Sequence, residues 1–264
     1  MSPRGSSSLG HLTAAVLVAA LLAAPGALAA PPTPSAPSAK AAPSPTVDEI
    51  VGRYVTARGG IQKLRALRTL RQEGRVSTGA GREGLVTREI KRPGKIRFEF
   101  TVQGVTSVFA SDGQRGWKVS PLEGELGPRP LPDEVLIDAR EQADIDGPLV
   151  DWKSKGNQVE LVGREAVDGH DAYKLKLTLK SGGVLTAYLD VESASLVRTE
   201  ATRHLRGKQV RIETTFGDYR RTGGILFPYL VEVRAAGRPQ VLRVVVDKVE
   251  VNPPLSDTRF TPPA

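Results

Sequence analysis

Residues that could perform acid–base or metal chemistry are few in this sequence, and they are scattered. The three histidines are His11, His170 and His204, and no HExxH motif or paired His/carboxylate spacing accompanies them. The chain contains no cysteine, which excludes thiolate metal ligands, cysteine nucleophiles and disulfide bonds. We therefore expect neither a metal site nor a cofactor.

Two pairs of carboxylates lie close together in the sequence, Asp133 with Glu134 and Asp144 with Asp146. Both pairs fall in or beside a stretch with a helical pattern, where helix ends and solvated charges account for them more simply than a catalytic acid and base. No G-x-S-x-G motif is present, and the glycine pairs lie in hairpin contexts instead of phosphate-binding loops. We predict that the protein is not an enzyme and has no catalytic residue.

The N-terminal segment has the layout of a secretory signal peptide. Arg4 precedes an uncharged apolar run over residues 12–24, then Pro25 breaks the run, and small residues end at Ala29. The alternative is an uncleaved anchor, but thirteen residues at about 1.5 Å each fall well short of a hydrocarbon core about 30 Å thick. We predict a signal peptide over residues 1–29, cleavage near Ala29 and a periplasmic location.

The next segment, residues 30–45, consists of Pro, Ala and Ser with one Lys, and such a composition predicts a disordered linker. The folded domain is then expected over residues 46–264. The formal net charge of the whole chain is +8, but its basic residues are spread singly along predicted strands. A solvated outer face explains this charge, with weak attraction to anionic lipids as the alternative, and export argues against a nucleic-acid partner.

The domain is predicted to begin with two short helices. Thr46 and Glu49 form a capping-box pattern at the start of the first, and Gly59-Gly60 ends it. Apolar residues at helical spacing define the buried faces: Val47, Ile50, Val51 and Tyr54 in the first helix, and Ile61, Leu64 and Leu67 in the second.

From about residue 69 the apolar period changes from 3.6 to 2, which is typical of antiparallel strands with one buried face. The alternation is clearest in 95–103, 173–180 and 209–216. Further strands are predicted over 70–79, 83–92, 105–111, 115–121, 158–166, 183–190, 195–205, 226–235 and 240–251. An insertion over residues 130–150 has a helical pattern instead, beginning near Pro132 and ending at Gly147-Pro148.

The expected fold is mostly β: an unclosed antiparallel β-barrel of roughly ten to twelve strands, with about three helices as a lid over its concave face. A gap between such a sheet and its lid would bind apolar ligands. An ordinary packed core without a cavity is the alternative that the pattern leaves open.

Two segments resemble the LolA-like family of outer-membrane lipoprotein-sorting proteins. They are VDEIVGRYVTARGGIQKLRALRTLRQEGRV at the start of the domain, and FGDYRRTGGILFPYLVEV followed by VLRVVVDKVEVNPPLSDTRFTPP at its end. The resemblance covers about residues 46–264. It implies a half-barrel with a helical lid that carries lipoprotein acyl chains across the periplasm, and it makes Arg97 and Arg115 the candidates for that family's functional arginine.

The resemblance leads to the hypothesis of a carrier that binds lipoprotein acyl chains or another lipid and helps to move it to the outer membrane. Donor or acceptor proteins in the inner or outer membrane would be its partners, and we expect a monomer. The alternative hypothesis is a sensor module like RseB, which shares this fold and would bind lipid or outer-membrane protein segments. The predicted cavity residues are Phe98, Phe100, Phe109, Trp117, Leu175, Leu177, Tyr188, Ile212 and Tyr229, with Leu131, Val135 and Leu136 from the lid.

Overall fold

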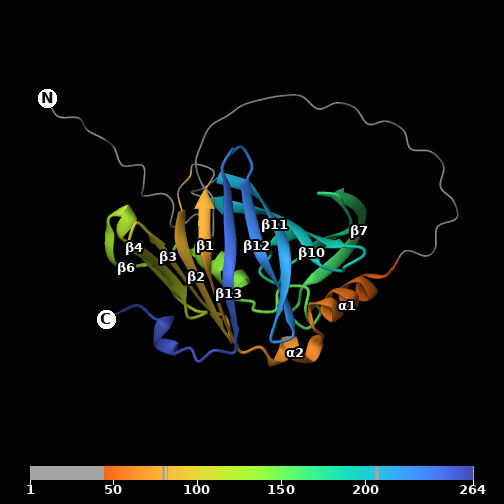
Figure 1. The fold of residues 1–264 in the computed structure, drawn as a ribbon, viewed down its shortest axis with the longest axis horizontal. Helices are drawn as coiled ribbons and strands as arrows, with labels where there is room; N and C mark the ends of the chain where they lie inside the picture. The colour runs from red at the N-terminus through yellow and green to blue at the C-terminus, as the bar shows by residue number, and fades with distance from the viewer. Residues whose placement is uncertain (1–44, 79–80, 82, 206–207, 264) are drawn as a thin grey trace.

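The computed structural model describes residues 45–78, 81, 83–205 and 208–263 of the chain (Figure 1). The predicted signal peptide and all of the predicted linker except Pro45 lie outside the described residues. No helix within the described residues is long and apolar enough to cross a membrane.

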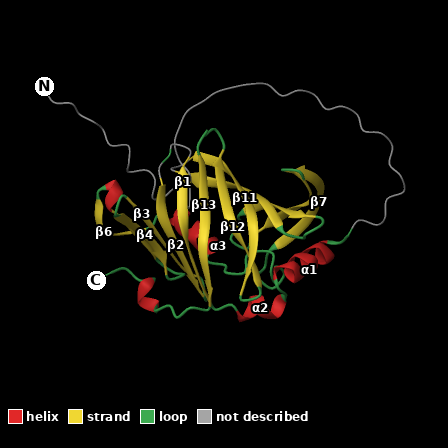
Figure 2. Ribbon diagram, in the orientation of Figure 1, coloured by secondary structure: helices red, strands yellow, loops and turns green. Residues whose placement is uncertain are grey.

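The dominant element is one antiparallel sheet of thirteen strands in the order β6-β5-β4-β3-β2-β1-β13-β12-β11-β10-β9-β8-β7 (Figure 2). The strands are β1 (Thr69–Thr78), β2 (Glu83–Lys91), β3 (Lys95–Val102), β4 (Val105–Ser111), β5 (Gly116–Ser120), β6 (Glu125–Pro130), β7 (Gln158–Val167), β8 (His170–Thr178), β9 (Val184–Asp190), β10 (Leu196–Leu205), β11 (Lys208–Thr222), β12 (Ile225–Ala235) and β13 (Val241–Val251).

The sheet consists of two meanders, β1–β6 and β7–β13, joined side by side where β1 pairs with β13. Its outermost strands, β6 and β7, do not pair with each other, so the curved sheet stays open. Pro128 and Pro130 in β6 lack the N–H that a further strand would need, which suits an edge position. The predicted unclosed half-barrel is therefore confirmed.

The strand prediction was accurate except at β6. Each of the twelve predicted ranges overlaps one observed strand, and the thirteenth strand, β6, was missed. Its prolines and its exposed side chains remove the alternation that identifies a half-buried strand. The expected ten to twelve strands were accordingly one too few.

Helices α1 (Val47–Arg58) and α2 (Ile61–Ala66) precede the sheet, and α1 contacts β12 and β7. The predicted capping box is confirmed, because the Thr46 hydroxyl accepts from the Glu49 N–H and the Glu49 carboxylate accepts from the Thr46 N–H. Gly59 ends α1 at φ 125°, where it lies against the main-chain oxygen of Gly224 so closely that a Cβ would collide.

Helix α3 (Asp133–Gln142) lies in the segment that connects the two edge strands, residues 131–157. This connecting segment must pass from one end of the open sheet to the other, and Figure 2 shows α3 behind β2 and β13. The helix is shorter than the predicted helical stretch, because turns follow Gln142 up to β7. Two short 3₁₀ helices, η2 (Pro121–Glu123) and η3 (Asp257–Arg259), complete the described elements.

The apolar residues of the concave face and the buried faces of the helices form one core. The opposite face of β1–β5 is covered by the C-terminal segment. There Phe260 is fully buried, and its main-chain oxygen accepts a hydrogen bond of 3.0 Å from the indole N–H of Trp117. The C-terminal segment therefore packs against one face of the sheet, and α3 lies over the other.

Candidate functional site

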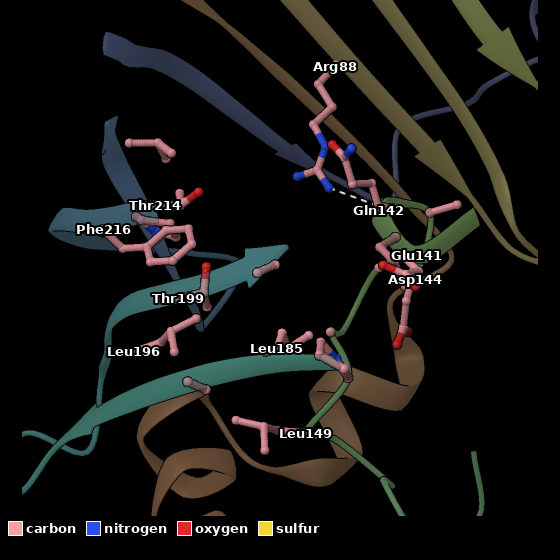
Figure 3. A pocket seen from close by; sticks show the side chains of 18 of the residues that line it. Arg88, Glu141, Gln142, Asp144, Leu149, Leu185, Leu196, Thr199, Thr214 and Phe216 are labelled. Atoms are coloured by element: carbon pink, nitrogen blue, oxygen red, sulfur yellow. Dashed lines mark hydrogen bonds between the residues drawn. The ribbon is translucent and has the colours of Figure 1, made fainter. Parts of the chain in front are cut away.

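A cavity of about 1070 Å³ lies between the concave face of the sheet and the connecting segment. We refer to it below as the cavity (Figure 3). Strands β1, β2, β3 and β8–β13 contribute to its wall, together with α3 and the turns after it. Most of the lining side chains are apolar, among them Leu177, Ile212, Phe216, Phe227, Val231 and Val244.

Strand alternation explains which residues reach the cavity. On β11 the lining residues are Ile212, Thr214 and Phe216, and on β10 they include Thr199 and Ala201. Successive side chains of a strand point to opposite faces, so every second residue of these strands faces the concave side. A sheet that does not close leaves the space between these side chains and α3 incompletely filled.

Arg88 on β2 is the most unusual residue of the lining. It lies between Val86 and Ile90 on the apolar face of its strand, and its guanidinium is 5.9 Å from the centre of the Phe98 ring. Its Nη1 donates to the Gln72 side-chain oxygen at 3.1 Å, and its Nη2 donates to the Gln142 main-chain oxygen at 2.9 Å.

No carboxylate of the described residues pairs with Arg88, and its Nε is buried without a hydrogen-bond partner. Burial lowers the pKa of the Arg88 guanidinium to about 10, so that the group still carries its charge at neutral pH. The sequence alone could have indicated Arg88, because it stands at a position of β2 where the alternation predicts an apolar side chain.

A second arginine connects the sheet to α3. The Nη1 of Arg203 on β10 lies 3.0 Å from an Asp138 carboxylate oxygen and 2.6 Å from one of Glu141, and both acids belong to α3. The Glu141 carboxylate also accepts from the Ser181 hydroxyl at 2.7 Å. Polar contacts from both halves of the sheet therefore hold α3 over the cavity.

The predicted carboxylate pair Asp144 and Asp146 lies in the turns after α3, in an ion-pair cluster. Lys155 Nζ is 2.7 Å from Asp144 and 3.1 Å from Asp146, and Arg92 is 2.9 Å from Asp146. Burial raises the pKa of Asp144 to about 6. Burial opposes ionisation of Asp146 too, but hydrogen bonds from Asp144 and Arg92 outweigh it and hold its pKa near 2. Both carboxylates therefore form ion pairs with lysine and arginine, and this indicates a structural role in the connecting segment.

In the part of the chain that the structure describes, no group of three or more His, Asp or Glu side chains is placed to hold a metal ion. His170 instead contacts Asp190 at 3.1 Å in a turn region.

Three of the predicted cavity residues line the cavity, namely Phe98, Leu177 and Ile212. Phe100 and Phe109 pack against Phe98, with ring centroids 6.3 and 6.5 Å from it. They lie in the core with Leu175 and do not line the cavity.

Trp117, Tyr188 and Tyr229 do not line the cavity either. Trp117 packs beneath the C-terminal segment on the other face of the sheet. Tyr188 belongs to a separate cluster with Val167 and Ala172. The Tyr229 hydroxyl lies 2.9 Å from that of Thr222. Trp117 and Tyr188 were predicted to face the cavity, but the strand register puts them on the opposite face of the sheet.

The predicted lid residues Leu131, Val135 and Leu136 do not line the cavity either. Leu131 and Leu136 pack over Gly116 at the start of β5, where a Cβ would meet both side chains, and Val135 packs against the core. The apolar face of α3 therefore fastens the helix to β3–β5. The residues of α3 that reach the cavity are the more polar set of Ile137, Arg140, Glu141 and Gln142.

Arg97 and Arg115, the two candidates for the functional arginine, lie outside the cavity. Arg97 pairs with Glu99 at 2.7 Å and donates to the Arg259 main-chain oxygen at 2.8 Å, beneath the C-terminal segment. Arg115 is exposed in the turn between β4 and β5. Three arginines of the cavity lining pair with no carboxylate of the described residues, namely Arg58, Arg88 and Arg140. Arg88 differs from the other two because its Nε is also buried without a hydrogen-bond partner.

The sequence matches no known family model and no curated protein. Its fold is similar to those of solved structures at low sequence identity, including the following three. A DUF1329 family protein from Desulfovibrio piger is 15% identical, with a TM-score of 0.56, and the match covers 81% of this chain and 97% of that one. A putative outer membrane lipoprotein-sorting protein domain from Vibrio parahaemolyticus is 11% identical, with a TM-score of 0.54 and coverage of 80% and 94%.

The third structure is a LolA superfamily protein from Nitrosomonas europaea. It is 14% identical, with a TM-score of 0.54, over 83% of this chain and 98% of that one. At these identities the likeness concerns the fold. The chain has a LolA-like fold, in agreement with the resemblance of its terminal motifs.

Proposed function

We propose that this protein is a carrier of acylated cargo, a lipoprotein or another lipid, and that the acyl chains occupy the cavity beneath α3. In this proposal the chain is exported by residues 1–29, works in the periplasm and helps its cargo to reach the outer membrane. The observation that carries the proposal is an apolar-lined cavity of about 1070 Å³ on the concave side of an open sheet.

The size and lining of the cavity favour a long apolar ligand. Ligand sites commonly measure about 300–1,000 Å³, so this cavity of about 1070 Å³ is slightly larger than that range. Its wall is built from aliphatic and aromatic side chains of nine strands, with no cluster that would hold a metal ion among the described residues. This wall therefore favours a ligand that binds by burying its apolar surface.

The expected binding free energy of an acyl chain is suitable for reversible transport. Each buried methylene contributes about 0.8 kcal/mol, so about ten of them contribute about 8 kcal/mol, the scale of micromolar binding before the costs of ordering the chain. Such an affinity would hold a ligand in transit and still release it to an acceptor.

The attachment of α3 suits entry and release. The hydrogen bond of Arg88 to Gln142 and the ion pairs of Arg203 with Asp138 and Glu141 reach α3 from opposite sides of the cavity. These polar contacts can exchange with water more readily than a packed apolar interface. We infer that the end of α3 near Gln142 moves to admit cargo, while its apolar face stays on β3–β5.

The comparison with the Vibrio parahaemolyticus domain supports the choice of cargo, because that protein is described as a putative lipoprotein-sorting domain. The likeness extends over most of both chains.

The test is binding of a neutral acyl probe, methyl cis-parinarate, which becomes fluorescent when it leaves water. We expect saturable binding by the purified protein. Ala201→Phe, which fills part of the cavity, should weaken binding at least about tenfold, a loss of about 1.4 kcal/mol. Thr202→Phe is the matched control, because the neighbouring exposed side chain does not line the cavity.

Lipid analysis of the protein isolated from its own cell envelope is the companion measurement. Mass spectrometry should detect an acylated molecule in stoichiometric amounts, and a mature N-terminus just after Ala29. Absence of bound lipid together with no probe binding would refute the carrier proposal. An intact residue 1 on the cellular protein would refute the predicted cleavage.

A further inference from the structure

The charged side chains of the cavity wall are mostly cations. Seven arginines and lysines line the cavity, against three carboxylates, those of Glu73, Glu141 and Asp144. Arg92, Lys155 and Arg203 pair with acids that include Asp146 and Asp138, which do not line the cavity. Among the described residues no carboxylate pairs with Arg58, Arg88 or Arg140. An unpaired charge that faces apolar surroundings is costly, so these remaining cations indicate a negatively charged ligand.

The three lining carboxylates are already neutralised by other cations. Glu73 pairs with Arg71 at 2.8 Å, Glu141 with Arg203 at 2.6 Å, and Asp144 with Lys155 at 2.7 Å. None of them forms an ion pair with Arg88, whose hydrogen-bond acceptors are the neutral oxygens of Gln72 and Gln142.

Arg88 thus presents an uncompensated charge to the cavity. A guanidinium has five N–H bonds, and the two hydrogen bonds to Gln72 and Gln142 leave the others, including that of the buried Nε, without a protein acceptor among the described residues. Its planar donors match the two oxygens of a carboxylate or a phosphate ester.

Polar and apolar side chains line different parts of the cavity, and Arg88 lies in the polar part (Figure 3). Figure 3 shows its guanidinium close to Gln142, on the side where Glu141 and Asp144 lie, with Phe216 and Leu196 across the cavity and Leu185 and Leu149 below. A ligand with one acidic end and a long apolar remainder fits this division.

We propose that the cavity selects amphiphiles with an acidic head, a carboxylate or a phosphate ester, and that Arg88 binds this head inside the protein. The inference rests on the proposed carrier function and adds the chemical class of the ligand to it. The apolar chain then extends from Arg88 across the wall formed by β9–β12, and the cationic surplus of the lining compensates the charge of the head.

The test compares cis-parinaric acid with its methyl ester, which differ only in the charge of the head. We expect the wild-type protein to bind the acid at least about tenfold more tightly than the ester, the scale of a charge-assisted hydrogen bond. Arg88→Met should abolish this preference, which is measured as the ratio of the two affinities within each variant, so that a change in α3 common to both probes does not affect it. Arg88→Lys keeps the charge without the planar fork and should retain part of the preference.

Arg75→Met is the matched control, because Arg75 is an exposed arginine of the neighbouring strand β1 that pairs with Asp247 and does not line the cavity. It should bind both probes like wild type. If Arg88→Met does not fold, as judged by circular dichroism, the preference of the wild-type protein and of Arg88→Lys still decides the question.

A competition experiment distinguishes a carboxylate head from a phosphate head. Palmitate, lysophosphatidic acid and the uncharged monopalmitoylglycerol would each displace methyl cis-parinarate. Stronger displacement by palmitate assigns a carboxylate, and stronger displacement by lysophosphatidic acid assigns a phosphate. Equal displacement by all three, or a preference for the acid that survives in Arg88→Met, would overturn the acidic-head proposal while leaving the carrier function intact. Failure of both parinaric probes to bind would overturn both.

Discussion

The Nη2 of Arg88 donates a hydrogen bond of 2.9 Å to the main-chain oxygen of Gln142, which joins the concave face of β2 to the last residue of α3. Through this bond one residue takes part both in the wall of the cavity and in the position of the segment that covers it. Occupancy of the cavity and the mobility of α3 are therefore expected to depend on each other.

Removal of this connection should loosen the end of α3. In Arg88→Met we expect amide hydrogen exchange of residues 141–147 to accelerate severalfold, while exchange in β11 and β12 stays as in wild type, because local opening depends on the contacts of the local segment. Hydrogen exchange followed by mass spectrometry of peptides measures this directly. Unchanged exchange after Gln142 would show that the other contacts of α3, such as the ion pairs of Arg203, are sufficient to hold its end.

A buried acid on the other face of the sheet depends on the C-terminal segment. Glu89 is 1% exposed, and Arg259 Nε lies 2.6 Å from its carboxylate. Arg259→Met should lower the free energy of unfolding by about 2–3 kcal/mol, because it leaves a buried charge with only the more distant Arg71.

Adding Glu89→Gln to Arg259→Met should recover at least half of that loss, since the charge that needed Arg259 is gone. Urea unfolding of the single and double variants provides the measurement. Arg75→Met, which removes an exposed ion pair, should change stability by less than about 1 kcal/mol. Equal losses in the single and double variants would contradict the assignment of the loss to Glu89.

Asp144 should make the stability of the protein fall as the pH rises toward neutrality. Its pKa is about 6 in the folded state against 3.8 as the ordinary value, so the folded state binds this proton more tightly than the unfolded state. Its contribution is then fully present below about pH 4 and is lost as the pH rises through 6.

The shift from 3.8 to about 6 corresponds, at about 1.4 kcal/mol for each pKa unit, to a loss of about 3 kcal/mol. Urea unfolding at several pH values should show this decline in wild type relative to Asp144→Asn, which has no proton to lose. Parallel stability curves for the two proteins between pH 4 and 7 would refute the raised pKa.

Two glycines of α1, one in the middle of the helix and one at its C-terminal end, should respond to alanine in opposite ways. Gly52 is exposed in the helix with open space around its Cβ position, so Gly52→Ala should raise stability by about 0.5–1 kcal/mol. Gly59 has φ 125° and abuts Gly224, so Gly59→Ala should lower stability by more than about 1 kcal/mol. Thermal unfolding of the two variants distinguishes these signs, and a shift in the same direction for both would contradict the arrangement of α1 against the β11–β12 turn.

The local sequence pattern was sufficient to predict most helices and strands of this protein. The capping box of Thr46 and Glu49, the end of α1 at Gly59 and twelve strands followed from the sequence, because caps and alternation depend on neighbours in the chain. The exception, β6, has prolines where alternation would be expected. The terminal motifs correctly indicated the LolA-like fold.

Tertiary structure alone decided which side chains meet at the cavity. Alternation separates two faces of a strand without saying which of them a remote segment covers, so Trp117 and Tyr188 were predicted at the cavity but pack on the other face. Arg88 reaches its partner Gln142 only because β1 pairs with the distant β13 and the connecting segment returns across the open sheet. Contacts between segments far apart in the chain depend on the packing of the whole sheet, and no local spacing encodes them.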